Sequence, residues 1–334
     1  MKDTQKTRYI EIVRRTLPFL AFAIPFIMLY LLYPSSFEAT WKGRTYYLFF
    51  LWLFLLEMIM SSAKPEPMEK KPWFLKAIFV LSLFLPTMYV VTANYSGLNT
   101  LIVNEAGRLG VGWPSLMPLS TEYLVLAMLF ALIVSLNYGI SNLADFPISI
   151  FFLGTIGAIY TIDNLYPYGN FTPFQLIVPT TAFLAMGVLN LMGYHTVALP
   201  IDSPDKVPYF IASNAQGQIS QPLGIAWACS GVESLIIYTI TILLFLRRST
   251  FSYAARTIYF VIGAVITYFI NILRIATLFI ISVQGGDIGP FHDYYGQLYS
   301  ISWILSYPLI MIGSQLLWSK ITKPSKDHKD SKKR

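Results

Sequence analysis

Three side chains in the C-terminal half of the chain are of the types that acyl transfer needs. Cys229 is the only cysteine among the 334 residues, Arg274 stands inside an apolar run, and His292 follows that run. A thiolate nucleophile, an imidazole that moves protons and a fixed cation beside a developing oxyanion form a complete set for this chemistry. The elements that carry these residues must therefore meet if the chemistry is to occur.

The neighbours of Cys229 suit a nucleophile. Ser230 and Gly231 are small and let another group approach closely. We expect Cys229 in the first turn of a helix, where the helix dipole lowers a thiol pKa. Glu233, four residues later on the same face, could pair with Arg274 or orient a base. A lone cysteine in a membrane protein is more commonly a small buried hydrophobic residue, so the residue type alone does not establish that Cys229 is a nucleophile.

Arg274 requires an explanation, because a charge inside an apolar span costs several kcal/mol. Asn271 lies three residues earlier on the same helical face and is a candidate second donor to an oxyanion. A snorkelling side chain or an ion pair between helices would also account for Arg274. His292 and the adjacent Asp293 fall in the loop between the last two apolar segments, where an interfacial histidine is the simpler interpretation.

The composition identifies a polytopic membrane protein. Hydrophobic residues make up 55% and charged residues only 12%, about half the charge of an ordinary soluble domain. This excludes a disordered chain, a disulfide-rich secreted scaffold and a conventional cytosolic enzyme. One cysteine cannot form an intramolecular disulfide or supply a cysteine-rich zinc site. We expect no cofactor and no metal.

The basic residues gather at the two ends of the chain. They precede the first apolar run and recur between residues 320 and 334, within a net charge of +7. Such clusters are more typical of cytoplasmic ends than of nucleic-acid contacts. We therefore expect no nucleic-acid partner, both termini inside, and an even number of membrane crossings.

About eight apolar segments approach the 20 residues that a spanning helix needs. They are Leu17–Tyr33, Thr45–Ser62, Trp73–Ala93, Thr121–Tyr138, Pro147–Asp163, Ile225–Leu246, Thr257–Val283 and Gln297–Trp318. A further stretch, Pro173–Gly193, contains a proline and several polar residues, and we expect an interfacial helix there. Lys42 and Arg44 would fall outside, a minor violation of the charge rule.

The expected fold is an all-α polytopic membrane protein of about eight transmembrane helices, with both termini inside. The alternation within Tyr194–Pro222 adds a small β-hairpin cap on the outer face, beside the interfacial helix. The chain forms a single integral membrane domain. Residues 1–120 give N-terminal helices and an outer loop, 121–318 the catalytic core, and 319–334 a basic cytoplasmic tail.

Three ordered motifs resemble the archaeosortase/exosortase family. They are Ala228-Cys-Ser-Gly231, Asn271-Ile-Leu-Arg274, and His292 with Gly296 four residues later. The resemblance is clearest over Phe174–Trp318, and upstream it extends only to hydrophobic helices. The extra helices and the Val-Glu-Ser continuation after Gly231 are most similar to archaeal members, the thaumarchaeal group among them.

The resemblance implies a cysteine transpeptidase or protease in the cell membrane. With both termini inside, the predicted topology places its active site on the outer face. It would cleave the C-terminal sorting signals of membrane-anchored surface proteins and transfer the remaining protein, as an acyl group, to an acceptor such as a lipid. Cys229 would be the nucleophile, His292 the acid/base, and Arg274 the substrate or oxyanion stabiliser. The predicted supporting or substrate-binding residues are Asn271, Ser230, Glu233 and Asp293.

Two other classes of protein stay open at this point. Arg274 and Arg108 could hold a polyprenyl phosphate in a lipid-modifying transferase, although such sites generally need more cations, or carboxylates for a metal. A transporter would need a polar path through the bilayer midplane, where Glu57 and Arg274 are the main charges. Convergence of Cys229, His292 and Arg274 in space would favour the transpeptidase.

Overall fold

The computed structural model describes residues 2–39, 41–61, 65–66, 71–167, 170–199 and 207–322. The helices are α1 (Lys2–Leu32), α2 (Thr45–Met60), α3 (Trp73–Tyr95), α4 (Leu98–Arg108), α5 (Met117–Tyr138), α6 (Pro147–Leu165), α7 (Thr172–Gln175), α8 (Val178–Leu191), α9 (Val232–Arg248), α10 (Tyr253–Val283) and α11 (Gly296–Thr322). Three short strands, β1 (His195–Ala198), β2 (Tyr209–Ser213) and β3 (Leu223–Gly224), form one antiparallel sheet.

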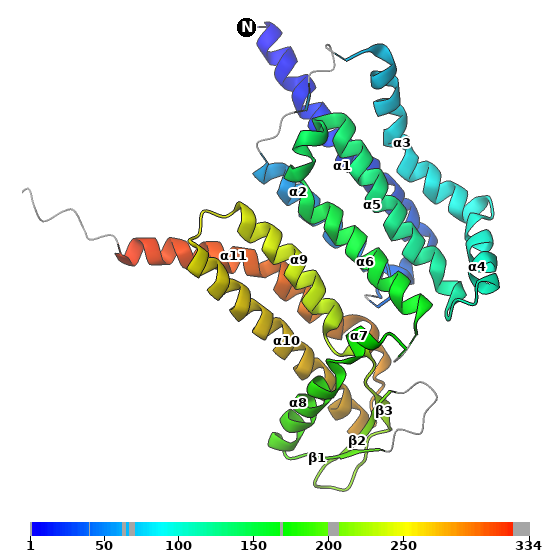
Figure 1. Ribbon diagram of the computed structural model, residues 1–334, viewed down its shortest axis with the longest axis vertical. Coiled ribbons are helices and arrows are strands. Elements are labelled where there is room, and N and C mark those ends of the chain that lie inside the picture. Colours follow the sequence, from blue (N-terminus) through cyan, green and yellow to red (C-terminus); the bar gives the residue numbers. More distant parts are fainter. Residues whose placement is uncertain are drawn as a thin grey trace, which may run out of the picture.

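The long helices form two groups (Figure 1). The first contains α1, α2, α3, α5 and α6, and the second contains α9, α10 and α11. Helix α9 packs against both α6 and α10 and so joins the groups. The core of the first group is aromatic: Phe54 and Phe130 are fully buried, with ring centroids 4.7 Å apart in an edge-to-face arrangement. Such a ring pair contributes about 0.5–1.5 kcal/mol beyond its buried area.

Seven helical segments in the described part of the chain are long and apolar enough to cross a bilayer. They are Val13–Leu32, Trp73–Tyr95, Pro114–Tyr138, Pro147–Leu165, Pro173–Leu191, Tyr253–Val283 and Phe291–Trp318. Helices α2 and α9, with 16 and 17 residues, are shorter. The all-α polytopic membrane fold is confirmed, whereas the count of eight crossings and the orientation of the termini stay predictions.

Helices α8 and α9 lie end to end along α10 (Figure 1). The Tyr238 hydroxyl of α9 donates a hydrogen bond to the Phe260 carbonyl of α10. Further along α10, the Tyr268 hydroxyl lies 2.8 Å from the Thr181 hydroxyl of α8. At 1.5 Å per residue, the 31 residues of α10 extend about 46 Å, beyond a hydrocarbon core of about 30 Å. Phe183 and Leu191 of α8 are 77% and 91% exposed. The interfacial placement of Pro173–Gly193 stays a prediction, because Pro173–Leu191 is also long and apolar enough to span a membrane.

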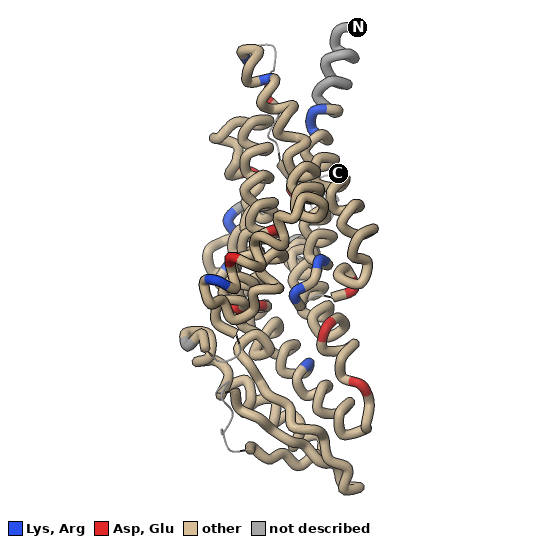
Figure 2. Tube along the Cα trace, turned by 90° about the vertical axis from the view of Figure 1, so that its right-hand side faces the viewer, with Lys and Arg blue, Asp and Glu red and all other residues tan. Residues whose placement is uncertain are grey.

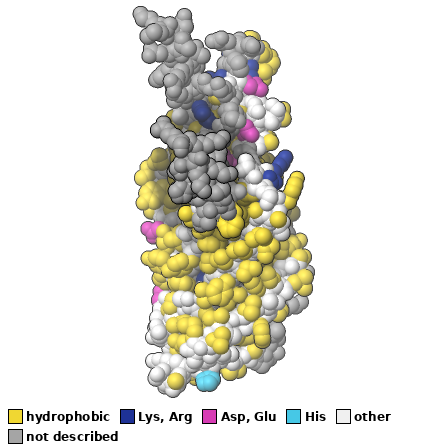
Figure 3. Space-filling view, turned by 90° about the vertical axis from the view of Figure 1, so that its left-hand side faces the viewer, with side chains coloured by type: hydrophobic (Ala, Val, Ile, Leu, Met, Phe, Trp, Pro, Cys, Tyr) yellow, Lys and Arg dark blue, Asp and Glu magenta, His cyan; other side chains and the backbone are white. Residues whose placement is uncertain are grey.

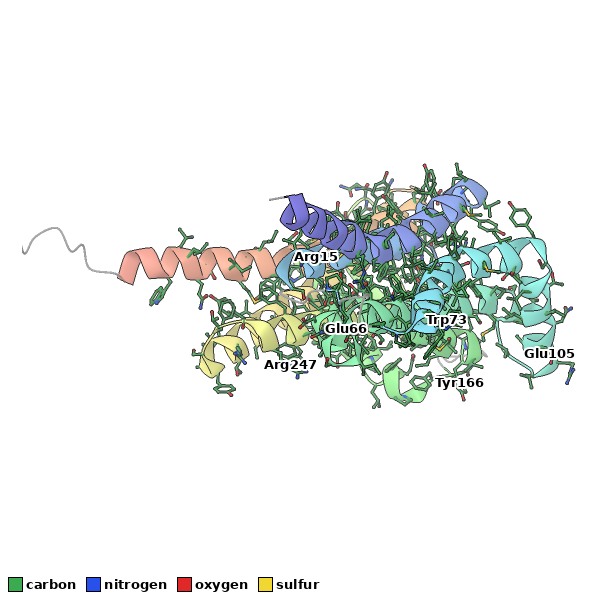
Figure 4. All side chains as sticks on the ribbon, turned by 90° about the horizontal axis from the view of Figure 1, so that it is seen from above. Arg15, Glu66, Trp73, Glu105, Tyr166 and Arg247 are labelled. Atoms are coloured by element: carbon green, nitrogen blue, oxygen red, sulfur yellow. The ribbon has the colours of Figure 1, made fainter. Side chains whose placement is uncertain are left out.

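The surface is apolar over the long helices, and the described strands of the cap carry no charged side chain. Figure 3 shows hydrophobic side chains gathered on the face that includes α10, where Ile258, Val265 and Phe269 are exposed. The described residues of α7, α8 and the three strands carry no Lys, Arg, Asp or Glu (Figure 2). Seen from above, α11 projects away from the side that holds α3 and α4 (Figure 4). An exposed apolar face of this extent is suited to lipid.

Two local expectations about the Cys229 segment were wrong, and two elements go beyond what the sequence predicted. The Cys-bearing helix begins at Val232, not Ile225, because Gly231 adopts a φ of 91° before it. Cys229 lies in the preceding 3₁₀ turn, Trp227–Cys229, so the helix-dipole argument does not apply to it. The cap is three-stranded, since β3 adds to the hairpin through Tyr209 and Phe210. The outer segment before α5 contains a helix, α4, that no pattern indicated.

Lys42 and Arg44 are held inside the fold. The Arg44 guanidinium donates to both carboxylate oxygens of Glu122 at 2.7 and 2.9 Å. Lys42 Nζ lies 2.6 Å from an Asp163 oxygen, and both side chains are buried. These pairs explain the apparent violation of the charge rule, because the two cations are neutralised within the protein. Glu57 is likewise used structurally, since its oxygens accept from the first backbone amides of α6.

Candidate active site

The cysteine and the histidine are in contact. Cys229 Sγ lies 3.7 Å from His292 Nε2, within the 6 Å that we expect of a resting catalytic pair. On the other side of the ring, His292 Nδ1 lies 2.7 Å from an Asp293 carboxylate oxygen. His292 sits in the π-helical turn Phe291–Tyr295 immediately before α11. The three side chains therefore form a continuous chain of thiol, imidazole and carboxylate.

The Cys229 turn is fixed from both sides. Asn271 Nδ2 of α10 donates to the Cys229 carbonyl at 3.1 Å, and the Thr181 hydroxyl of α8 donates to the Ser230 carbonyl at 3.0 Å. A Cβ at Gly231 would lie 2.9 Å from Asn271 Nδ2, so only glycine allows this approach at a positive φ. Asn271 thus positions the cysteine backbone through one N–H of its amide.

Arg274 lies against the histidine turn and is 5% exposed. Its Nη2 donates to the His292 carbonyl at 3.3 Å. A Cβ at Gly296 would come within 2.7 Å of Arg274 Nε, so the glycine makes room for the guanidinium. Arg274 lines a cavity of about 330 Å³ between α10 and the start of α11, with Leu273 and Tyr299 on its walls. The buried cation is therefore adjacent to the Cys229–His292 pair.

The surroundings favour the thiolate form of Cys229, which precedes the first residue of α9. Burial by itself raises the pKa of the Cys229 thiol. The hydrogen bond to His292, the charge of His292 and the charge of Arg274 act in the opposite direction. Together they hold the pKa of Cys229 below its ordinary value. A thiolate is the reactive form of a cysteine nucleophile.

Glu233 and Ser230 are near Cys229 but are engaged elsewhere. Glu233 accepts a hydrogen bond from the Tyr46 hydroxyl at 3.0 Å, and no ion pair joins it to Arg274 among the described residues. The Ser230 hydroxyl donates to the Trp227 carbonyl at 2.6 Å. Both residues therefore support the turn from within the fold.

Sequence reasoning missed the contribution of the first loop. The Trp41 amide donates to the Asp293 carbonyl at 3.4 Å, so the segment between α1 and α2 braces the histidine turn. Beside it, the buried Lys42–Asp163 pair lies close enough for Asp163 to influence the Cys229 thiol electrostatically. These residues are separated from the histidine turn by more of the chain than any local pattern covers, so no sequence signal pointed to them.

The rival interpretations find little support in the geometry. Arg108 belongs to α4 and makes an exposed ion pair with Glu105, which lies at the edge of the molecule in Figure 4. It does not join Arg274 in a phosphate site. Glu57, the other deep charge, is occupied as the N-terminal acceptor of α6.

The fold and the site define a helical, multi-pass membrane protein with a cysteine–histidine centre beside a buried arginine. The model of the transmembrane exosortase family matches residues 15–308, and the chain belongs to that family. It is thus a membrane transpeptidase that processes C-terminal sorting signals. The match reaches upstream of the motif-bearing half into the N-terminal helices. No curated protein and no solved structure matches the chain significantly. Its similarity to archaeal members stays a prediction.

Proposed function

We propose that the protein is a cysteine transpeptidase in which Cys229, His292 and Arg274 carry out acyl transfer from a sorting signal to a lipid acceptor. The observation that carries this proposal is the 3.7 Å contact between Cys229 Sγ and His292 Nε2, with Arg274 bonded to the same turn. Asp293 orients the imidazole from its other nitrogen. This order of groups matches the nucleophile, base and orienting residue of cysteine acyl-transfer sites.

The first half of the reaction forms a thioester. The Cys229 thiol passes its proton to His292, and the sulfur attacks the scissile carbonyl carbon. Arg274 stabilises the oxyanion of the tetrahedral intermediate. The carbon–nitrogen bond then breaks, and His292 returns its proton to the departing amine. The C-terminal part of the substrate leaves, and the upstream part stays bound to Cys229 as an acyl group.

The second half resolves the thioester. An amine of the acceptor, or water, attacks the acyl carbon while His292 takes its proton, and the sulfur leaves as a thiolate. His292 returns that proton to Cys229, which restores the resting site. A lipid acceptor is supported by the exposure of Leu273 and Tyr299, which border the Arg274 cavity on the apolar outer surface. The substrate's own C-terminal helix would dock laterally against the same surface.

The proposal is tested by comparing C-termini of surface proteins between cells that carry the wild type and cells that carry Cys229→Ala. We expect mass spectrometry to find processed, acceptor-linked C-termini only with the wild type, because alanine has no nucleophile. His195→Ala is the matched control, since His195 is exposed on β1 and lines neither the cavity beside Cys229 nor the one beside Arg274. Processing that continues at the normal level with Cys229→Ala would refute the cysteine mechanism.

We further propose that the cap and the site face the outside of the cell. In a Cys229→Ala background, a single cysteine at Gln216 probes the cap, and one at Arg247 probes the far end of α9 (Figure 4). Both positions are exposed. An impermeant maleimide should label Gln216→Cys in intact cells and Arg247→Cys only after permeabilisation. The reverse pattern would place the site on the cytoplasmic side.

A further inference from the structure

An apolar pocket opens directly beside the cysteine and the histidine. It has a volume of about 300 Å³, and Cys229 and His292 form part of its wall. The rest of the wall is mainly aliphatic and aromatic, supplied by Leu223, Ile225, Ile275, Leu278, Phe279 and Ile288. No charged side chain other than His292 lines it among the described residues. It is separate from the cavity that Arg274 lines.

We propose that this pocket binds a large apolar side chain of the substrate residue whose carbonyl Cys229 attacks, and that Ile288 determines this preference. The inference rests on the proposed function, because it concerns the same acyl-transfer site. The side chain of the attacked residue is attached to its Cα, which is bonded directly to the reacting carbonyl carbon. A pocket with the nucleophilic sulfur in its wall is therefore within reach of that side chain.

The size and lining of the pocket select the occupant. Its volume is at the lower end of the range for ligand sites, enough for one bulky side chain but small for a two-chain lipid. A charged side chain would lose its hydration there without gaining a partner, which is strongly unfavourable. A small side chain would leave much of the pocket empty and would forgo the apolar contacts. A leucine, methionine or aromatic residue fits best.

Ile288 connects the pocket to the catalytic turn. Its side chain is half-buried at the rim, whereas Phe279 and Ile275 are fully buried in the core. Its carbonyl accepts a hydrogen bond from the His292 amide at 2.8 Å. A substitution at Ile288 keeps that backbone bond and changes only the pocket wall. Ile288 can therefore be altered with less disturbance of packing than its buried neighbours.

The test uses alkylation of the sole cysteine in the full-length protein in detergent micelles. Acetyl-dipeptide chloromethyl ketones with Phe, Ala or Lys next to the reactive carbon are compared, and intact mass gives the rate of Cys229 modification. Each rate is divided by that for iodoacetamide, which has no side chain to place. We expect the Phe probe to react at least tenfold faster than the Ala and Lys probes, the discrimination typical of an apolar pocket. Equal rates for the three probes would overturn the proposal.

A charge introduced at the rim should redirect the preference. We expect Ile288→Glu to slow the Phe probe and to speed the Lys probe at least tenfold relative to the wild type. Ile219→Glu, on the exposed part of the cap and outside the pocket, is the matched control and should leave all ratios unchanged. Equal changes in both variants would reject Ile288 as the determinant, and the wild-type probe series tests the pocket even if Ile288→Glu fails to fold.

The outcome can be separated from that of the proposed function. Selective labelling together with unprocessed surface proteins would reject the transpeptidase proposal and retain the pocket. Normal processing together with unselective labelling would reject the pocket and retain the transpeptidase. The assignment of the pocket would also be overturned if cleavage of peptides depended on the residue after the scissile bond and not on the residue whose carbonyl Cys229 attacks.

Discussion

Lysine in place of Arg274 is expected to lower substrate processing by roughly 10²–10³-fold, close to the loss expected for alanine. Removal of one donor from an oxyanion site typically has this effect. Lysine keeps the positive charge, but its ammonium cannot reproduce the planar fork of a guanidinium. Gly296 leaves room for the guanidinium, and Arg274 itself is only 5% exposed. Processing is measured as the fraction of a sorting-signal substrate cleaved at equal enzyme levels.

A second measurement separates stabilisation of the oxyanion from a merely structural role. Alkylation of Cys229 by iodoacetamide forms no oxyanion, so Arg274→Lys should change its rate by far less than it changes processing. If the hydrogen bond from Arg274 to the His292 carbonyl mainly positions the turn, both rates should fall together. Processing within about twofold of the wild type would contradict the assignment of Arg274 to the transition state.

The membrane fold could be predicted because apolar runs report burial in lipid directly. The runs that became α1, α3, α5, α6 and α10 stand out by length and composition alone. Helix boundaries were harder to predict from the sequence, since they depend on the conformation of single residues. The start of α9 moved to Val232 because Gly231 adopts a left-handed conformation, and the sequence marks the glycine but not its φ. The extra strand β3 depends on pairing with β2, a contact that two residues of sequence cannot indicate.

The candidate site could be predicted from the sequence where its residue types are unusual in a membrane protein. A sole cysteine, an arginine within an apolar helix and a histidine at a helix junction each attract notice by type. The residues that position these three side chains are of ordinary types and do not attract notice in the sequence. Thr181 is an ordinary helix residue until α8 brings its hydroxyl to the Ser230 carbonyl. The sequence suggested Asn271 as a donor to the oxyanion, but it could not show that packing of α10 against the turn directs one N–H of this amide to the Cys229 carbonyl.

Methionine in place of Arg44 should destabilise the protein by about 3–5 kcal/mol, because it leaves a buried carboxylate without its cation. Glu122 is 2% exposed and receives two hydrogen bonds from Arg44; among the described residues, only the Tyr47 hydroxyl would then still donate to it. The midpoint of thermal unfolding in detergent is the measurement. Arg108→Met is the matched control: its ion pair with Glu105 is exposed, and we expect a loss below about 1 kcal/mol.

The double variant Arg44→Met/Glu122→Leu should regain most of the lost stability, because it removes the uncompensated charge and leaves an apolar pair of similar volume. The same loop carries the Trp41 amide that donates to the Asp293 carbonyl, so Arg44→Met should also slow iodoacetamide alkylation of Cys229. The double variant should restore that rate as the loop returns to its place. If Arg44→Met were no more harmful than Arg108→Met, the pair would not hold the loop, and the bracing of the histidine turn would have to come from elsewhere in the fold.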